Sequence, residues 1–293
     1  MRVGFIGLGN QGGPMARRIV DAGFTTTLWA RRPASLTPFT GTPAQRAVSA
    51  AELAAASDLV CVCVGDDADV EEVIVGDEGV LAGLRQGGVI AVHSTVHPDT
   101  CRRLADRARL RGVALVDAPV SGGGSAAAEG RLLVMVGGES GTVAFCRRVF
   151  ETYGDPVVHM GPLGSGQVAK LLNNALFTAN LATSADVLAL GRTLDVDPAG
   201  LADVLAHGSG ASFALRRVAA DGGTLERLAA HAGPLLRKDA RLLADLAEEA
   251  GTPAGTTVMR TADDALARMA QSVVIPAPGV RPVRGRVRGR RAG

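Results

Sequence analysis

Lysine is rare in this chain, and its two occurrences are the first residues whose type suggests chemistry. Of the 293 residues, 31 are lysine or arginine, yet the only lysines are Lys170 and Lys238. Arginine keeps its proton near neutral pH, whereas burial can lower the pKa of a lysine ammonium until it exchanges protons. Lys170 lies within an apolar helical pattern, so its amine is a candidate acid or base. The alternative is an ordinary lysine whose stem packs and whose charged head reaches water.

A second candidate site is a glycine-rich stretch near the N-terminus. It reads Gly7-Leu8-Gly9-Asn10-Gln11-Gly12. It follows the apolar run 2–6 directly and precedes a helical pattern, which is the context that dinucleotide binding requires. Gly7 permits the tight turn, Gly9 lets a pyrophosphate approach, and Gly12 allows the helix to pack closely on the strand. The diphosphate would lie at the helix N-terminus. The alternative is a turn that merely favours glycine.

The end of the next predicted strand, 25–29, indicates which dinucleotide binds. NAD-binding proteins usually place an aspartate or glutamate there to hold the ribose 2′-hydroxyl. This chain instead reads Ala30-Arg31-Arg32-Pro33 and offers two guanidinium groups, which match a 2′-phosphate. We therefore expect NADP(H) to be preferred over NAD(H), with two solvated surface arginines as the alternative.

Strand and helix patterns alternate up to residue 162. Apolar runs at 59–64, 89–92, 113–118 and 132–137 are typical of buried strands. The alternation predicts an α/β fold in which residues 1–162 form a Rossmann, doubly wound parallel sheet. Beyond it the strand signals stop, so residues 163–272 are predicted to form an all-α domain that binds substrate and mediates dimerisation. The arginine-rich stretch 273–293 is predicted to be a basic disordered tail.

In such sheets, ligands bind at the carboxyl ends of the strands. Three predicted loops lie there and contain candidate residues. They read Val64-Gly65-Asp66, His93-Ser94-Thr95 and Ser121-Gly122-Gly123-Gly124. The triple glycine would expose backbone N–H groups that can hold a carboxylate. The alternative is a plain loop.

Composition limits the possible functions. The net charge is +2, and six arginines follow residue 280, so the remainder is slightly acidic and is not expected to bind nucleic acid. No signal-peptide pattern and no run of about 18 apolar residues occurs, which predicts a soluble, cytoplasmic protein without membrane contact. The four cysteines lack zinc spacing, so no metal is expected. The long apolar helical pattern 168–190 suits a homodimer or homotetramer and predicts a buried helix.

Four motifs resemble, in the same order, those of the β-hydroxyacid dehydrogenase family, which includes 3-hydroxyisobutyrate dehydrogenase and several semialdehyde reductases. They are Gly4–Ala16, Asp117–Gly123, Gly166–Asn174 and Lys238-Asp239, and the resemblance spans residues 1 to about 270. It implies an NADP-dependent enzyme that transfers hydride between the cofactor and a small 3-hydroxy acid, or its semialdehyde or 2-oxo acid.

The resemblance also implies roles for the matching residues. Lys170 would be the catalytic acid/base, and Asn174, one helical turn later, would orient the substrate or the lysine. The substrate carboxylate would bind Ser121, Gly122 and Gly123. The nicotinamide side would be lined by Val64, Gly65 and Thr95, and Lys238 would reach the cofactor with Asp239 beside it.

The chain departs from the family pattern at several of these positions. They are Gln11, Ala30, His93 and the run Val64-Gly65-Asp66. The sequence therefore predicts a class of chemistry without selecting one hydroxy acid. Two other functions stay open. An imine reductase is related in architecture but typically carries aspartate or tyrosine in place of Lys170. A non-catalytic cofactor-binding module would not need Lys170 and Asn174.

Overall fold

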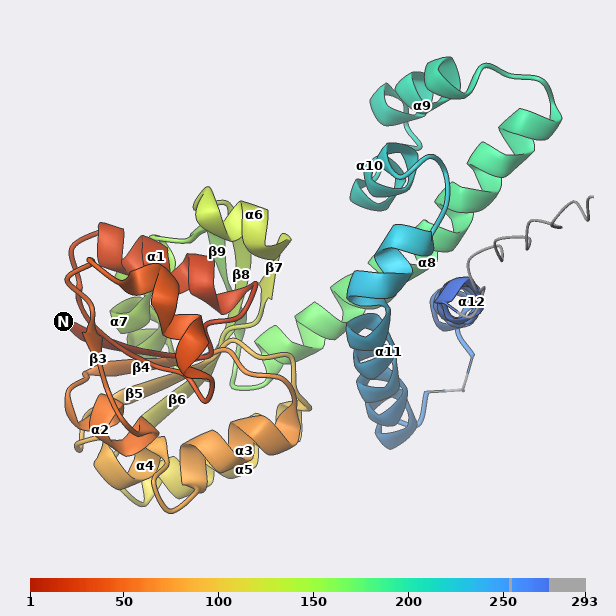
Figure 1. Ribbon diagram of the computed structural model, residues 1–293. Helices are drawn as coiled ribbons and strands as arrows, with labels where there is room; N and C mark the ends of the chain where they lie inside the picture. The colour runs from red at the N-terminus through yellow and green to blue at the C-terminus, as the bar shows by residue number, and fades with distance from the viewer. Residues whose placement is uncertain (253–254, 274–293) are drawn as a thin grey trace, which may run out of the picture. The chain divides into compact units, whose positions relative to one another are not determined.

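The computed structural model describes residues 1–252 and 255–273 (Figure 1). The chain divides into two compact units. The first combines Met1–Phe177 with Leu236–Met259, and the second combines Thr178–Leu235 with the chain from Arg260 onward. The predicted domain boundary between residues 162 and 163 stays a prediction. The predicted tail, except Val273, lies outside the described residues.

The first unit contains a nine-stranded sheet. Its strands are β1 (Arg2–Ile6), β2 (Thr25–Trp29), β3 (Gln45–Arg46), β4 (Leu59–Val62), β5 (Val89–Val92), β6 (Ala114–Asp117), β7 (Val120–Ser121), β8 (Leu132–Gly137) and β9 (Gly154–Gly161). They are ordered β3-β2-β1-β4-β5-β6-β8-β7, and β9 also pairs with β8. The strands from β3 to β6 are parallel, which confirms the predicted doubly wound sheet. In contrast, β8 is antiparallel to β6 and β7, because the short connection before it reverses the chain instead of crossing over.

Helices cover both faces of this sheet (Figure 1). They are α1 (Gly12–Asp21), α2 (Ala50–Ala55), α3 (Asp67–Val75), α4 (Val80–Gly83), α5 (Pro98–Arg109), α6 (Gly123–Ala128) and α7 (Ser140–Phe150), with a 3₁₀ helix at Pro33–Phe39. Buried side chains of α1, α6 and α7 pack on one face, and those of α2 to α5 pack on the other. Every residue of β4 and of β5 is buried as a result, which explains their continuous apolar runs.

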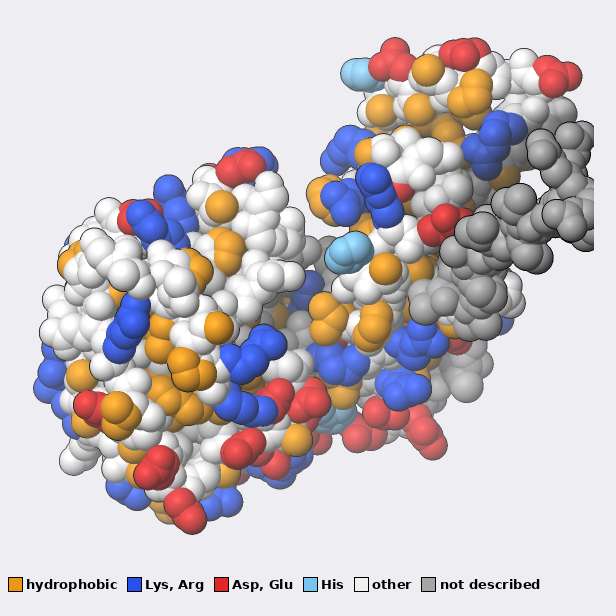
Figure 2. Space-filling view, viewed as in Figure 1, with side chains coloured by type: hydrophobic (Ala, Val, Ile, Leu, Met, Phe, Trp, Pro, Cys, Tyr) orange, Lys and Arg blue, Asp and Glu red, His pale blue; other side chains and the backbone are white. Residues whose placement is uncertain are grey.

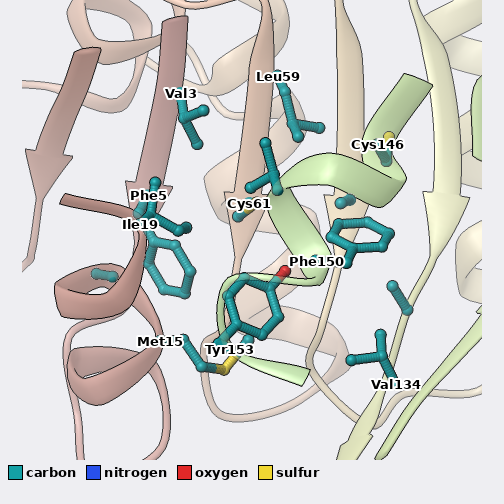
Figure 3. Packing of buried hydrophobic residues seen from close by; sticks show 14 of the residues in the cluster. Val3, Phe5, Met15, Ile19, Leu59, Cys61, Val134, Cys146, Phe150 and Tyr153 are labelled. Atoms are coloured by element: carbon teal, nitrogen blue, oxygen red, sulfur yellow. The ribbon is translucent and has the colours of Figure 1, made fainter. Parts of the chain in front are cut away.

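One face of the sheet contains an aromatic cluster (Figure 3), and the ring of His93 packs against its members. Phe150 and Tyr153 lie among apolar side chains from β1, β4 and α1, and both are fully buried. The Tyr153 hydroxyl donates to Nε2 of His93 over 3.1 Å, and His93 Nδ1 donates to the carbonyl of Ala118 over 2.7 Å. Both ring nitrogens of the buried histidine are thus satisfied while the ring is neutral.

Five helices follow the sheet. They are α8 (Ser165–Thr193), α9 (Pro198–His207), α10 (Phe213–Ala220), α11 (Glu226–Glu249) and α12 (Thr257–Val273). The three long ones, α8, α11 and α12, each contain residues of both units. Asp197 caps α9, since its carboxylate accepts a hydrogen bond from Gly200 N over 2.6 Å and Pro198 follows it. None of the described helices is long and apolar enough to cross a membrane.

The predicted burial of α8 is met only in part within this single chain. The apolar pattern of α8 predicts a buried helix, yet Leu172 is 53% exposed and Leu190 is 56% exposed. Apolar composition on all sides therefore does not mean burial within this chain. The next long helix, α11, begins at Glu226 and continues through Pro234. A proline inside a helix costs one hydrogen bond without always ending the helix.

Candidate active site

The glycine loop between β1 and α1 has the shape that a diphosphate requires. Gly7 has a φ of 93°, and a Cβ there would lie 2.0 Å from the carbonyl oxygen of Cys63. A Cβ on Gly12 would lie 2.0 Å from the oxygen of Gly7. A Cβ on Gly9 would meet no described atom within 4 Å. The first and third glycines thus serve internal packing, while the middle one faces open space beside the N-terminus of α1, where a dinucleotide pyrophosphate fits.

The two arginines after β2 differ in their surroundings. Acidic and basic side chains are interspersed on the viewed face of the first unit (Figure 2). Arg31 has acidic partners. Its guanidinium lies 2.6 Å from a carboxylate oxygen of Asp69 and 3.6 Å from one of Glu72, both on α3. Arg32 precedes the 3₁₀ helix and is exposed. Local sequence gives no sign of these acidic partners, because Asp69, the nearer of the two along the chain, lies 38 residues after Arg31.

The loops after β4 and β5 are joined by hydrogen bonds. Val64 N donates to the Ser94 hydroxyl over 2.8 Å. Lys238, from α11, donates to the carbonyl oxygen of Thr95. A Cβ on Gly65 would lie 2.6 Å from a carboxylate oxygen of Asp69. The residues predicted for the nicotinamide side therefore lie together, and Lys238 is bonded to one of them.

The predicted carboxylate-binding loop adjoins the glycine loop. Gly122 and Gly123 have φ values of 131° and 79°, which a residue with a Cβ rarely adopts. A Cβ on Gly124 would lie 2.5 Å from the carbonyl oxygen of Asn10. Ser121 ends β7, opposite Leu133 in β8. The segment that would bind substrate thus packs directly on the segment that would bind the dinucleotide.

Lys170 belongs to α8, in the first unit, and lies near Asp239 and Lys238 of α11. Asn174 donates through Nδ2 to Oδ2 of Asp239 over 2.6 Å. Oδ1 of Asp239 lies 3.4 Å from the Lys238 amine but accepts no hydrogen bond from the described residues. Burial, more than the charge of Lys238, lowers the pKa of Lys170 to about 8, against the opposing effect of Asp239. An amine of this kind changes protonation state close to neutral pH.

Asp117 positions the helix that carries Lys170. In the sequence it is only the first residue of the motif Asp117–Gly123, with no role of its own. It ends β6 and is fully buried. Its two carboxylate oxygens accept hydrogen bonds from Gly164 N and Gln167 N, each over 2.7 Å. Since these N–H groups belong to the start of α8, Asp117 caps this helix. A carboxylate at the end of an apolar strand was the one sign in the sequence that Asp117 has a specific role.

The remaining polar residues noted in the sequence do not join this site. His93 faces the aromatic cluster, and burial lowers its pKa to about 4. Cys61, Cys101 and Cys146 are buried, and Cys63 is partly buried. The described residues contain no group of histidine, cysteine and acidic side chains that could hold a metal ion.

Two known protein families match this chain, one over each part of it. Residues 2–161 match the family described as the NAD binding domain of 6-phosphogluconate dehydrogenase. Residues 164–273 match the family described as NAD-binding of NADP-dependent 3-hydroxyisobutyrate dehydrogenase. Together the two matches account for nearly the whole described chain.

Individual proteins give the same result. A 3-hydroxyisobutyrate dehydrogenase of Pseudomonas aeruginosa is 37% identical, over 73% of this chain and 72% of its own length. An NAD-dependent L-serine dehydrogenase of the same organism is 35% identical over the same shares. Among solved structures, Mycobacterium tuberculosis 3-hydroxyisobutyrate dehydrogenase with L-serine has a TM-score of 0.79 and 26% identity, covering 92% of this chain and 94% of that one. The chain belongs to the β-hydroxyacid dehydrogenase family of NAD(P)-dependent oxidoreductases.

Proposed function

We propose that this protein transfers hydride between NADP(H) and either a small 3-hydroxy acid or its semialdehyde, or a small 2-oxo acid, with Lys170 as the acid/base. The observation that carries the proposal is the partly buried Lys170 amine, with a pKa of about 8, beside Asn174 and Asp239. The bound nicotinamide would supply or accept the hydride. The chain itself must hold the substrate and move one proton.

Lys170 can move that proton in both directions. In reduction, its ammonium form would donate to the oxygen of the carbonyl as negative charge develops there. In oxidation, its neutral form would accept the proton of the substrate hydroxyl. A pKa of about 8 leaves both forms populated near neutral pH. Asn174 is held by Asp239 and would orient the lysine or the substrate oxygen.

The loop at Ser121, Gly122 and Gly123 would bind the substrate carboxylate through backbone N–H groups. The relatives' names support a substrate of this kind. L-serine and 3-hydroxyisobutyrate each carry a carboxylate and a hydroxyl separated by two carbon–carbon bonds. Hydride removal at the hydroxyl carbon would give a 3-oxo acid or semialdehyde.

The preference for NADP(H) is supported by the guanidinium groups of Arg31 and Arg32 after β2. The second matching family is described as NADP-dependent, whereas the related L-serine dehydrogenase is NAD-dependent. We infer that Arg32 makes the first contact with a 2′-phosphate. Arg31 would join it by exchanging its carboxylate partners on α3 for the phosphate.

The proposal is tested by following NADPH and NADH oxidation with succinic semialdehyde, glyoxylate, tartronate semialdehyde, methylmalonate semialdehyde and one cyclic imine. We expect NADPH to be consumed with at least one aldehyde or 2-oxo acid. Consumption with the imine alone would assign the chain to the imine reductases. If the protein binds the dinucleotide but turns over none of these compounds, and also fails to oxidise 3-hydroxyisobutyrate or L-serine with NADP⁺, it would be a non-catalytic module.

Variants at the lysine test its assigned role. Lys170→Arg keeps the charge but cannot release a proton near neutral pH, so we expect it to abolish turnover and to leave dinucleotide binding unchanged. If Lys170→Arg retained most of the wild-type kcat, the acid/base assignment would be wrong. Arg237→Lys, on the neighbouring helix, is a control because Arg237 makes no contact assigned to the site.

A further inference from the structure

The side chain of Gln167 is a fully buried polar group that the proposed mechanism leaves unused. It lies in the first turn of α8, three residues before Lys170. Its Nε2 donates to the carbonyl oxygen of Ser94 over 2.8 Å, and its Oε1 accepts from Val96 N over 3.2 Å. A primary amide therefore bridges two backbone groups of the loop after β5.

The same loop is bound by α11. Lys238 donates to the carbonyl oxygen of Thr95, the residue between the two that Gln167 contacts. Three consecutive backbone positions, 94 to 96, are thus bound by two helices from distant parts of the sequence. Ser94 also accepts a hydrogen bond from Val64 N through its hydroxyl. This loop is consequently the common support of the candidate site.

The spacing along α8 connects this contact to the candidate acid/base. Gln167, Lys170 and Asn174 stand at positions i, i+3 and i+7, which share one face of a helix. A side chain that fixes this face at its first turn also fixes the rotation of the helix, and hence the direction of the residues that follow. The backbone N–H of Gln167 is fixed as well, since it donates to Asp117 over 2.7 Å.

We propose that Gln167 is a positioning residue, which locks the rotation of α8 against loop 94–96 and so holds Lys170 at the candidate site. Its consequence for turnover rests on the proposed function of Lys170. The charged groups that face the Lys170 amine are Asp239 and Lys238, both on α11. Rotation of α8 would move the amine relative to both of these groups and toward water.

The lysine content of the chain makes the proposal directly measurable. With only two lysines, protein labelled with ¹³C at lysine Cε gives two side-chain signals, and Lys238→Arg identifies which belongs to Lys170. Titration of these signals reports the position of Lys170 without any substrate. Gln167→Met has a similar size but forms neither hydrogen bond. We expect it to raise the titration midpoint of Lys170 by about half a pH unit or more, because the amine becomes better hydrated.

Tyr153→Phe is the matched control. It removes the buried hydrogen bond of Tyr153 with His93, in the same unit, and leaves both hydrogen bonds of the Gln167 side chain in place. It should leave the Lys170 titration unchanged. An unchanged Lys170 midpoint in folded Gln167→Met would overturn the proposal, and so would an equal shift in Tyr153→Phe.

Gln167→Glu covers the case in which the methionine variant does not fold. A protonated carboxylic acid can accept from Val96 N and donate to Ser94 O, as the amide does. We expect the native Lys170 signal at low pH and its displacement as the introduced acid ionises. If the Lys170 signal does not move when the introduced glutamate ionises, the proposal is contradicted.

Turnover is measured on the same proteins. We expect Gln167→Met to lower kcat about tenfold or more, with little change in KM for the dinucleotide, as misplacement of an acid/base predicts. If Lys170→Arg keeps its activity, the proposed acid/base role fails, while the titration still decides whether Gln167 positions the lysine.

Discussion

At the scale of single residues, the protein separates its ionisable groups by their surroundings. Lys170 is partly buried and has a pKa of about 8, whereas fully buried His93 has a pKa of about 4. Burial lowers both values, because it disfavours the charged form of a base. Of these two groups, only Lys170 changes protonation state near neutral pH, where an acid/base must work.

The pH dependence of turnover follows from the pKa of Lys170. Oxidation needs the neutral amine, so its rate should rise with pH and level off above about 8. Reduction needs the ammonium form, so its rate should fall above the same pH. Rate profiles measured in both directions between pH 6 and 10 check this expectation. Profiles that are flat across pH 8 in both directions would exclude Lys170 as the group that transfers the proton.

The carboxylates beside Arg31 should influence coenzyme choice. Asp69→Asn frees the guanidinium for a 2′-phosphate, so 2′,5′-ADP should bind about two- to fivefold more tightly, a change of the size typical of an exposed ion pair. The affinity for 5′-ADP should not change. Calorimetric titration with both ligands measures the difference. Glu71→Gln is the control, because Glu71 lies on the same helix but pairs with Arg103. Equal gains in both variants would indicate a general charge effect.

At the scale of elements, α8 is held at its first turn by groups from the ends of two strands. Asp117 binds two backbone N–H groups there, and Gln167 binds the loop after β5. The helix is long, but only its first turns carry the candidate residues. Its position in the first unit is therefore set by these buried polar contacts together with the apolar packing of Leu171 and Ala175 against Leu243 of α11.

The cap on α8 should be far more costly to alter than the cap on α9. Asp117→Asn replaces one of two accepting oxygens with an NH₂ group in a fully buried place, so we expect a loss of about 2–3 kcal/mol in unfolding free energy. Asp197→Asn should be nearly neutral, because it is exposed and asparagine caps helices about as well as aspartate. Urea unfolding of both variants checks the contrast. Equal effects would mean that the burial of Asp117 is unimportant.

At the scale of the whole molecule, the sequence predicted the order of strands and helices but not every contact between them. Alternating patterns were sufficient for the sheet, and the spacing of Lys170 and Asn174 was sufficient to put them on one helix face. The pairing of Asn174 with Asp239 joins residues 65 positions apart. Sequence spacing carries no such information without the resemblance to a family.

Two further features depend on choices that a local pattern does not encode. Arg31 is exposed and takes its partners from a helix that the fold brings close. The exposed leucines of α8 show that an apolar helix can remain uncovered by its own chain. The partners of Arg31 and the exposure of the α8 leucines are both determined by tertiary structure, because the local sequence is compatible with other partners and with burial.

The stability of the first unit should fall on mild acidification because of His93. Its folded pKa is about 4 and its ordinary value is 6.5, so between these values the unfolded chain binds the proton more readily. This group should therefore lower the unfolding free energy by about 3 kcal/mol between pH 7 and pH 4. Fluorescence of Trp29, the only tryptophan, can follow urea unfolding of this unit.

A double variant tests the origin of that acid sensitivity. His93→Leu combined with Tyr153→Phe removes the histidine and the hydroxyl that would lose its partner. Its unfolding free energy should depend less on pH between 4 and 6.5. Asp58, whose pKa is lowered to about 2 by Arg2 and Arg85 against the effect of its burial, acts in a separate range, since its contribution disappears only below pH 4. An unaltered pH dependence would assign the effect to other groups.

The return of residues 236–259 to the first unit has a consequence for biosynthesis. A ribosome releases the nine strands and the start of α8 well before it makes Lys238 and Asp239, which lie roughly eighty residues later and need several seconds at ordinary elongation rates. During that interval a nascent chain can assemble the sheet and the dinucleotide loop, but Asn174 and Thr95 lack their α11 partners. Competence for catalysis would therefore be acquired only after α11 has been synthesised.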